Sequence, residues 1–499
     1  MHVPLWRWRF TVMGAAVLAA VTGLSVGFGR GDDPPPPREA EKEKWRYVGA
    51  RFCKRCHDLE RPSKDYNTDY VLLTEYKTWH EEDKHAQAYY VLTQDRSQKM
   101  GKILDWNVEE DPRCLNCHAA NVPEKSRSND FAKSDGVSCD VCHGPASQWI
   151  VEHADKEWRT KAPAYKQKLG MYDVRDPVKL ARLCVSCHVG SVVEGKVVTH
   201  EMYAAGHPPL PSIEVGAFCE QMPRHWRDLR QKPEPVQKEI RAAFNIPQEE
   251  QERTKRTVVG AVVAFQASMV LLGDWPGGGA KKERIERSPE LANYDCYACH
   301  HELKSPSWRQ KRGYTGRPGR PPMHAWPTVL LEDALRYAED ADLTKQYNEQ
   351  MQNLRRAFDA RPFGDPKEVV ECAGQLRDWS ERLLQRLQKV RYNSSSARRL
   401  VRGLCGAKEA EKYDYDSARQ KAWAIDVILK ELEPKPTDRV QKSLADLNQQ
   451  LKLDLRSGTK NTKKQILPEL PERLHFLNEY DPEKFKSALE KLGPLLSRE

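Results

Sequence analysis

Ten of the thirteen cysteines in this 499-residue chain fall in five copies of Cys-x-x-Cys-His. This spacing is typical of covalent haem attachment, in which two thiols add to the haem vinyl groups and the next histidine binds the iron. Zinc sites are the alternative, but a zinc knuckle does not require the adjacent histidine. The sequence therefore predicts five haems c. The attachment cysteines are Cys53, Cys56, Cys114, Cys117, Cys139, Cys142, Cys184, Cys187, Cys296 and Cys299, and the proximal iron ligands are His57, His118, His143, His188 and His300.

A haem held only by its proximal histidine keeps one open iron position, which a second histidine would close. Nine histidines remain besides His2 and the five proximal ones, and eight of them lie between residues 46 and 328. This placement predicts distal iron ligands; the other readings for any one histidine are a propionate contact, a proton relay or a surface position. The candidate distal ligands are His85, His153, His200, His207, His225 and His324, while His475 is predicted to be structural.

Hydrophobic residues make up 39% of the chain and charged residues 31%, with a formal net charge of +9. Haem macrocycles would supply the apolar surface that this composition lacks. A basic surface of mixed charge favours redox partner proteins, acidic ones among them, or small anions such as nitrite. Nucleic-acid binding is disfavoured, because the sequence has no basic-aromatic patch or recognition motif.

The N-terminal residues resemble an export segment. Arg7 and Arg9 precede an apolar run from Phe10 to Phe28, and Arg30 follows it. Residues 1–30 are therefore predicted to be a signal peptide or an N-terminal membrane anchor, since the length fits either and no clear cleavage site is present. Both alternatives place the rest of the chain in the periplasm or at the outer face of the cytoplasmic membrane.

The remaining sequence divides into three parts. Residues 31–45 are rich in proline and charge and are predicted to be a linker. Residues 46–328 form the predicted pentahaem domain, which includes a helix from Glu250 to Leu272 that is expected to be buried in the protein and not to span a membrane. Residues 329–499 are predicted to be a separable helical domain, because apolar residues recur there every three or four positions, from Val369 to Val390 and from Val440 to Leu451. The expected fold class is mainly α, with little regular sheet.

The order of the first three motifs and the residues between them resemble multihaem cytochromes of the c-554 type. The resemblance rests on the segment from Trp79 to Ala88 and on the third motif, which continues with Gly-Pro and then His153. It covers about residues 50–210. It implies that His85 is the distal ligand of haem 3, that His153 is the distal ligand of haem 1, and that the iron bound by His118 is open.

The chain also departs from this family. The segment from Trp79 to His85 is one residue longer than expected, and neither the fifth motif nor the C-terminal region has a counterpart in the four-haem proteins. A Gly-His-Pro segment makes His207, together with His200, a candidate ligand of haems 4 and 5. An additional histidine could instead close haem 2.

Two function classes follow from these observations. The first is an exported cytochrome that relays electrons between redox partners, as the c-554 type accepts electrons from hydroxylamine oxidoreductase. The second is a haem enzyme that converts hydroxylamine, nitrite or nitric oxide at an open iron. Relay is favoured, because the histidines suffice for full ligation and no Cys-x-x-Cys-Lys motif marks a special haem. A scaffolding role in a membrane redox complex is compatible with relay.

Overall fold

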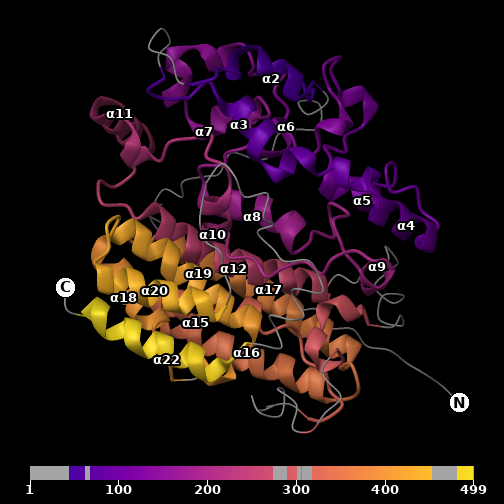
Figure 1. Ribbon diagram of the computed structural model, residues 1–499, viewed down its shortest axis with the longest axis vertical. Helices are drawn as coiled ribbons and strands as arrows, with labels where there is room; N and C mark the ends of the chain where they lie inside the picture. Colours follow the sequence, from indigo (N-terminus) through magenta and orange to yellow (C-terminus); the bar gives the residue numbers. More distant parts are fainter. Residues whose placement is uncertain are drawn as a thin grey trace, which may run out of the picture.

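The computed structural model describes residues 44–61, 68–273, 289–300, 305, 317–408, 410–451 and 480–497. These residues fold into α-helices and short 3-10 helices, and the only β-pairing among them is three isolated bridges. The mainly α fold class is thus confirmed. The predicted export segment and nearly all of the predicted linker lie outside the described residues. Short helices fill the upper part of Figure 1, and longer helices pack side by side below them.

The attachment motifs lie on short helices that end at or next to the proximal histidine. In the second and fourth motifs an aspartate caps the helix, and a proline follows it at the first helical position. Asp111 accepts from the Arg113 amide, and Asp176 accepts from the amides of Val178 and Lys179. These caps fix where each helix starts and so where its histidine lies. The motif helices are α2 (Ala50–His57), α5 (Pro112–His118), α6 (Cys139–His143), α8 (Pro177–His188) and the 3-10 helix η9 (Cys296–Ala298).

Further short helices surround these motifs and position the other histidines. His85 and His153 lie on 3-10 turns, whereas His200 begins an α-helix. These elements are α3 (Glu75–Glu82), η1 (Lys84–Gln87), η2 (Tyr90–Thr93), α4 (Asp95–Leu104), η5 (Glu152–Ala154), α7 (Pro163–Lys168), α9 (His200–Ala205), α10 (Val215–Gln221) and α11 (Glu234–Phe244).

The C-terminal half consists of longer helices with one apolar face each. In α17 the predicted stripe is buried, and Leu376, Trp379 and Leu383 have no exposed surface. In α20 the stripe of Val440, Leu444 and Leu447 is buried in the same way. The helices are α12 (Glu252–Gly273), α15 (Leu331–Ala338), α16 (Ala341–Asp359), α17 (Pro366–Gln388), α18 (Ser394–Leu404), α19 (Tyr415–Leu432), α20 (Asp438–Gln450) and α22 (Pro482–Leu492).

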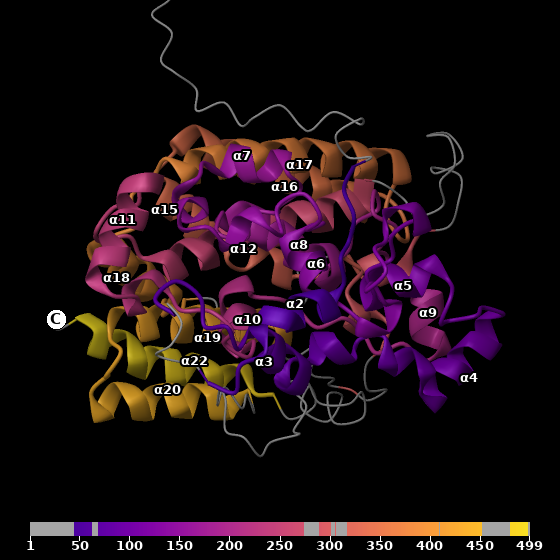
Figure 2. The same cartoon turned by 90° about the horizontal axis from the view of Figure 1, so that it is seen from above.

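Helix α12 lies in the middle of this bundle. It is long and apolar enough to cross a membrane, but it packs against α8, α17 and α19, and Val262 and Phe265 are fully buried. Figure 2 shows it enclosed by neighbouring helices. The buried position agrees with the predicted core helix. One hydrophobic core joins α8, α10 and α12 to α15–α22, so the domain boundary predicted at residue 328 lies within a continuous core.

Candidate haem centres

Four of the five proximal histidines face a second imidazole in the folded chain. The partners come from elsewhere in the sequence, up to 103 positions away. The distances between ring centres are 6.2 Å for His57 and His153, 6.4 Å for His118 and His207, 6.3 Å for His188 and His85, and 6.2 Å for His300 and His200.

These separations are what two axial imidazoles on one iron require. Two metal–nitrogen bonds of about 2 Å, plus half the width of each ring, place the ring centres about 6 Å apart. Direct contacts between aromatic rings span about 4.5–7 Å, so it is the pairing of each of four proximal histidines with a second imidazole, together with the distance, that points to iron ligation. Each pair therefore fits the two axial positions of a haem iron.

Hydrogen bonds at Nδ1 orient several of these rings and leave Nε2 available. Nδ1 of His118 contacts the Ala88 carbonyl oxygen at 2.8 Å, and Nδ1 of His207 contacts the carbonyl oxygen of Pro208 at 2.7 Å. Nδ1 of His153 is 2.5 Å from the Ile150 carbonyl oxygen. A histidine ligand commonly donates its second N–H in this way, which fixes its tautomer and orientation.

At two other histidines of these pairs, the partner of Nδ1 is a carboxylate. Glu75 lies 2.9 Å from Nδ1 of His57, and Asp83 lies 3.0 Å from Nδ1 of His85. Burial alone would raise the pKa of Glu75 and of Asp83, but the hydrogen bonds to the imidazoles outweigh it and hold both pKa values below their ordinary range. Both carboxylates therefore stay ionised beside an iron-facing ring.

The third motif has a different environment. Burial in the first place, and then the nearby His225, lower the pKa of His143 to about 4. Nδ1 of His225 faces the Pro223 carbonyl oxygen at 3.3 Å, which again leaves Nε2 unoccupied by that contact. Of the candidate ligands, His225 is thus the one whose charge acts on the third proximal histidine.

Two other histidines of the haem region have different roles in the structure. Nε2 of His324 lies 3.0 Å from the Ala292 carbonyl oxygen, so a backbone group engages this nitrogen in the folded chain. His80 is exposed and stacks on Tyr76, with ring centres 5.5 Å apart. His301 and His475 lie outside the described residues.

Contacts between thiols show which motifs are neighbours. The thiol of Cys53 in the first motif lies close to that of Cys139 in the third, and the thiol of Cys117 in the second lies close to that of Cys187 in the fourth. Cys142 of the third motif also lies within electrostatic range of Cys187. Spatial order therefore follows motifs 1, 3, 4 and 2, which differs from their order in the sequence.

The sequence around the first three attachment motifs matches a known protein family. Residues 52–144 match the sequence profile described as cytochrome c554 and c-prime, and the match spans the first three motifs. Over these residues the chain is similar to cytochromes c of the c-554 type. No curated protein and no solved structure was found to match the chain. A c-554 type cytochrome holds covalent haem c and takes part in electron transfer or redox chemistry.

Two of the imidazole pairs differ from the ligand pairs that the c-554 resemblance implied. His85 faces His188 of the fourth motif, whereas the resemblance implied the third haem. His118, whose iron would be open in the family, faces His207 across the distance that a ligand pair requires. His153 faces His57, the partner that the resemblance implied. The extra sequence after residue 188 supplies His200 and His207, which explains how this cytochrome differs from its family.

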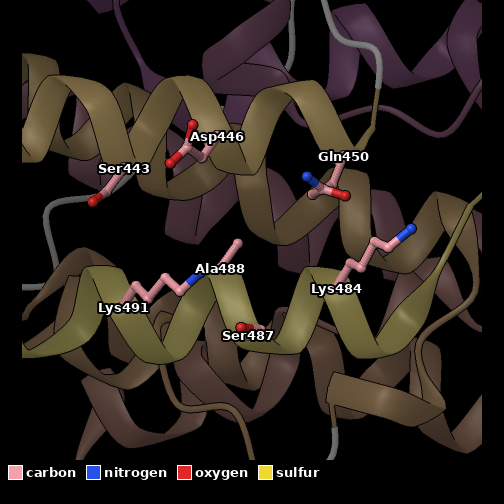
Figure 3. A pocket seen from close by; sticks show the side chains of 7 residues that line it. All are labelled: Ser443, Asp446, Gln450, Lys484, Ser487, Ala488 and Lys491. Carbon is pink, nitrogen blue, oxygen red and sulfur yellow. The ribbon is translucent and has the colours of Figure 1, made fainter.

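The described residues enclose one cavity beside a haem motif and another within the C-terminal helices. A cavity of about 80 Å³ lies beside His188 of the fourth motif and is also lined by Leu271, His324 and Trp326. A cavity of about 220 Å³ lies between α20 and α22 and is lined by Asp446 of α20 and by Lys484 and Lys491 of α22 (Figure 3). The second cavity has no histidine or cysteine in its lining, and we assign it no chemistry.

Proposed function

We propose that the chain is an exported pentahaem c-type cytochrome that relays electrons between redox partners. The observation that supports this best is the set of four imidazole pairs at iron-bridging distance. An iron with a histidine on each face is saturated, so it accepts and releases single electrons without changing its ligands. The protein's part is to hold neighbouring haems close together and to set their potentials.

The relay order follows from the contacts between motifs. Thiol contacts support the order of haems 1, 3, 4 and 2. Helix α9 supports a link to haem 5, because His200 starts this helix and His207 follows its last turn, so neighbouring residues supply ligands to haems 5 and 2. We therefore propose that neighbouring haems follow one another in the order 1, 3, 4, 2 and 5.

The ligand set of each haem is part of this proposal. His57, His118, His188 and His300 would bind iron opposite His153, His207, His85 and His200, respectively. For haem 3, His143 would bind iron opposite His225, which is the distal candidate that acts on it electrostatically. His324 is excluded from the set, since its Nε2 contacts a carbonyl oxygen.

The export part of the proposal rests on residues 1–30 and on the haem motifs, because haem is attached to such motifs outside the cytoplasm. The location would be the periplasm or the outer face of the cytoplasmic membrane, with the segment retained as an anchor or removed as a signal. N-terminal sequencing of protein from a haem-attaching periplasm separates these two outcomes.

The deciding experiment counts haems and their spin states in the purified protein. Mass spectrometry should show five haem additions, and electron paramagnetic resonance should show low-spin signals only. Fewer than four additions would contradict the pentahaem proposal. A high-spin haem that binds hydroxylamine or nitrite would contradict a function limited to electron transfer. It would support an enzyme that acts on a small nitrogen compound at that haem.

A further inference from the structure

Helix α4 and the preceding 3-10 helix η2 form a surface that combines exposed apolar and basic side chains. Tyr90, Val91 and Ile103 are 58%, 41% and 68% exposed, which is unusual for large apolar residues. The basic residues Arg96, Lys99 and Lys102 are exposed on the same helix. We call these six residues the α4 surface. Both Figure 1 and Figure 2 show α4 at the outer edge of the molecule, beside α5 and α9.

Arg96, Lys99 and Ile103 lie on one side of the helix, because they are three and four positions apart. The buried residues of α4 are Met100 and Gly101, and Met100 packs with Leu92 and other apolar residues of a small core. The exposed apolar residues are therefore not left over from an incomplete core.

The α4 surface lies directly over the second haem centre. Ala88, whose carbonyl oxygen contacts Nδ1 of His118, is two residues before Tyr90. The Arg96 side chain of α4 is within electrostatic range of the His207 imidazole. Helix α4 also packs against α9, which precedes His207. The chain segments that carry or contact the two proposed ligands of haem 2 thus adjoin α4.

Nearby acidic side chains are largely engaged by other partners. Asp111 binds Arg113 at 2.5 Å, and Glu110 binds Lys133 at 2.6 Å. Glu109 accepts a hydrogen bond from Gln98 at 3.0 Å. Asp95 and Asp105 lie at the two ends of α4, so the middle of its exposed face is basic.

We propose that the α4 surface is the docking site for an acidic redox protein that exchanges electrons with haem 2. The proposal rests on the proposed relay function. Complementary charge would steer and orient such a partner, and the exposed apolar side chains would be buried at the contact. The reaction is transfer of one electron: the partner's centre is oxidised as the haem 2 iron passes from ferric to ferrous, with no bond formed or broken.

The test uses the full haem-loaded chain and a reduced acidic plant-type [2Fe–2S] ferredoxin as the probe, whose potential of about −400 mV makes it an electron donor. Stopped-flow absorbance gives the second-order rate of haem reduction at several salt concentrations. In the double variant Lys99→Glu and Lys102→Glu, the rate at low salt should fall about tenfold or more, with a weaker salt dependence. Replacing Ile103 by Ser should slow the reaction about fivefold at all salt concentrations.

The matched control reverses two exposed lysines of the helical bundle, Lys389→Glu and Lys442→Glu, so that the net charge changes by the same amount. Its rate should stay within about twofold of the parent. Equal losses in both double variants, or no loss in the first, would overturn the docking site. Dithionite, which needs no docking, should reduce every variant alike. Failure of the parent protein to load haem or to be reduced by dithionite would instead refute the proposed relay.

Discussion

At the scale of single residues, the nitrogen atom that each histidine leaves available separates candidate ligands from the rest. His207 has its Nδ1 engaged, whereas His324 has its Nε2 engaged. We expect His207→Ala to convert one low-spin haem into a high-spin haem that binds carbon monoxide when reduced, because the thioethers still hold it. His324→Ala is the control and should leave the spectra unchanged. If His324→Ala alone opened a haem, the ligand set proposed for this protein would be wrong.

The carboxylates beside two histidines are expected to set haem potentials. An ionised carboxylate at Nδ1 gives the imidazole more negative charge, which stabilises ferric iron and lowers the potential. We therefore expect Glu75→Gln to raise the potential of haem 1 by about 60 mV, which is a tenfold change in a one-electron equilibrium. Asp83→Asn should raise the potential of haem 4 in the same way.

Potentiometric titration of the visible absorbance measures these shifts. The control is Glu60→Gln, since Glu60 is exposed and contacts Lys77 instead of a histidine. Potentials that stay unchanged in Glu75→Gln would mean that the hydrogen bond to His57 does not persist when iron is bound.

At the scale of elements, α9 connects two haem centres because histidines lie at both of its ends. The backbone N–H of His200 donates to Glu290 at 2.6 Å, while the chain turns towards His207 at Gly206, whose φ is 121°. Only glycine adopts this conformation without strain. Gly206→Ala should cost about 1–3 kcal/mol and displace His207. We expect a high-spin fraction at haem 2 while haem 5 stays low-spin, as measured by electron paramagnetic resonance.

Gly374→Ala in α17 is the matched control for this prediction. An added Cβ would meet no atom within 4 Å at either glycine, so the two positions differ in backbone conformation and not in space. Because Gly374 is helical, alanine should stabilise the protein by about 0.5–1 kcal/mol and leave all haem signals unchanged. Loss of the haem 2 signal in both variants would contradict the role assigned to Gly206.

At the scale of the whole molecule, the haem region and the helical region depend on each other for a core. Helix α12 fills the groove between α8, α17 and α19, although it comes before the last haem motif. A fragment of residues 329–499 would expose the apolar face that α12 covers. We expect it to retain helical circular dichroism but to bind a hydrophobic dye and to lack near-ultraviolet signals. A fragment of residues 177–499 keeps α8 and α12 and, once loaded with haem, should show a native near-ultraviolet spectrum.

The sequence by itself determined the local features of this protein. The five attachment motifs can be read from the sequence, because the two thiols and the histidine that act on one haem lie within five consecutive residues. Helical periodicity at residues 369–390 and 440–451 was sufficient to predict α17 and α20, since one face of each helix had to be buried. The c-554 resemblance was confirmed by the family match.

Only the tertiary structure decided which imidazoles face each other. His85 and His188 are 103 residues apart, and their approach depends on how η1 and α8 pack, which no spacing rule contains. The same holds for His118 and His207, whose pairing depends on a helix that follows the matched family segment. The core shared by the haem region and the C-terminal helices could not be predicted from the sequence either. The apolar pattern of α12 shows that the helix is buried but does not show which helices cover it.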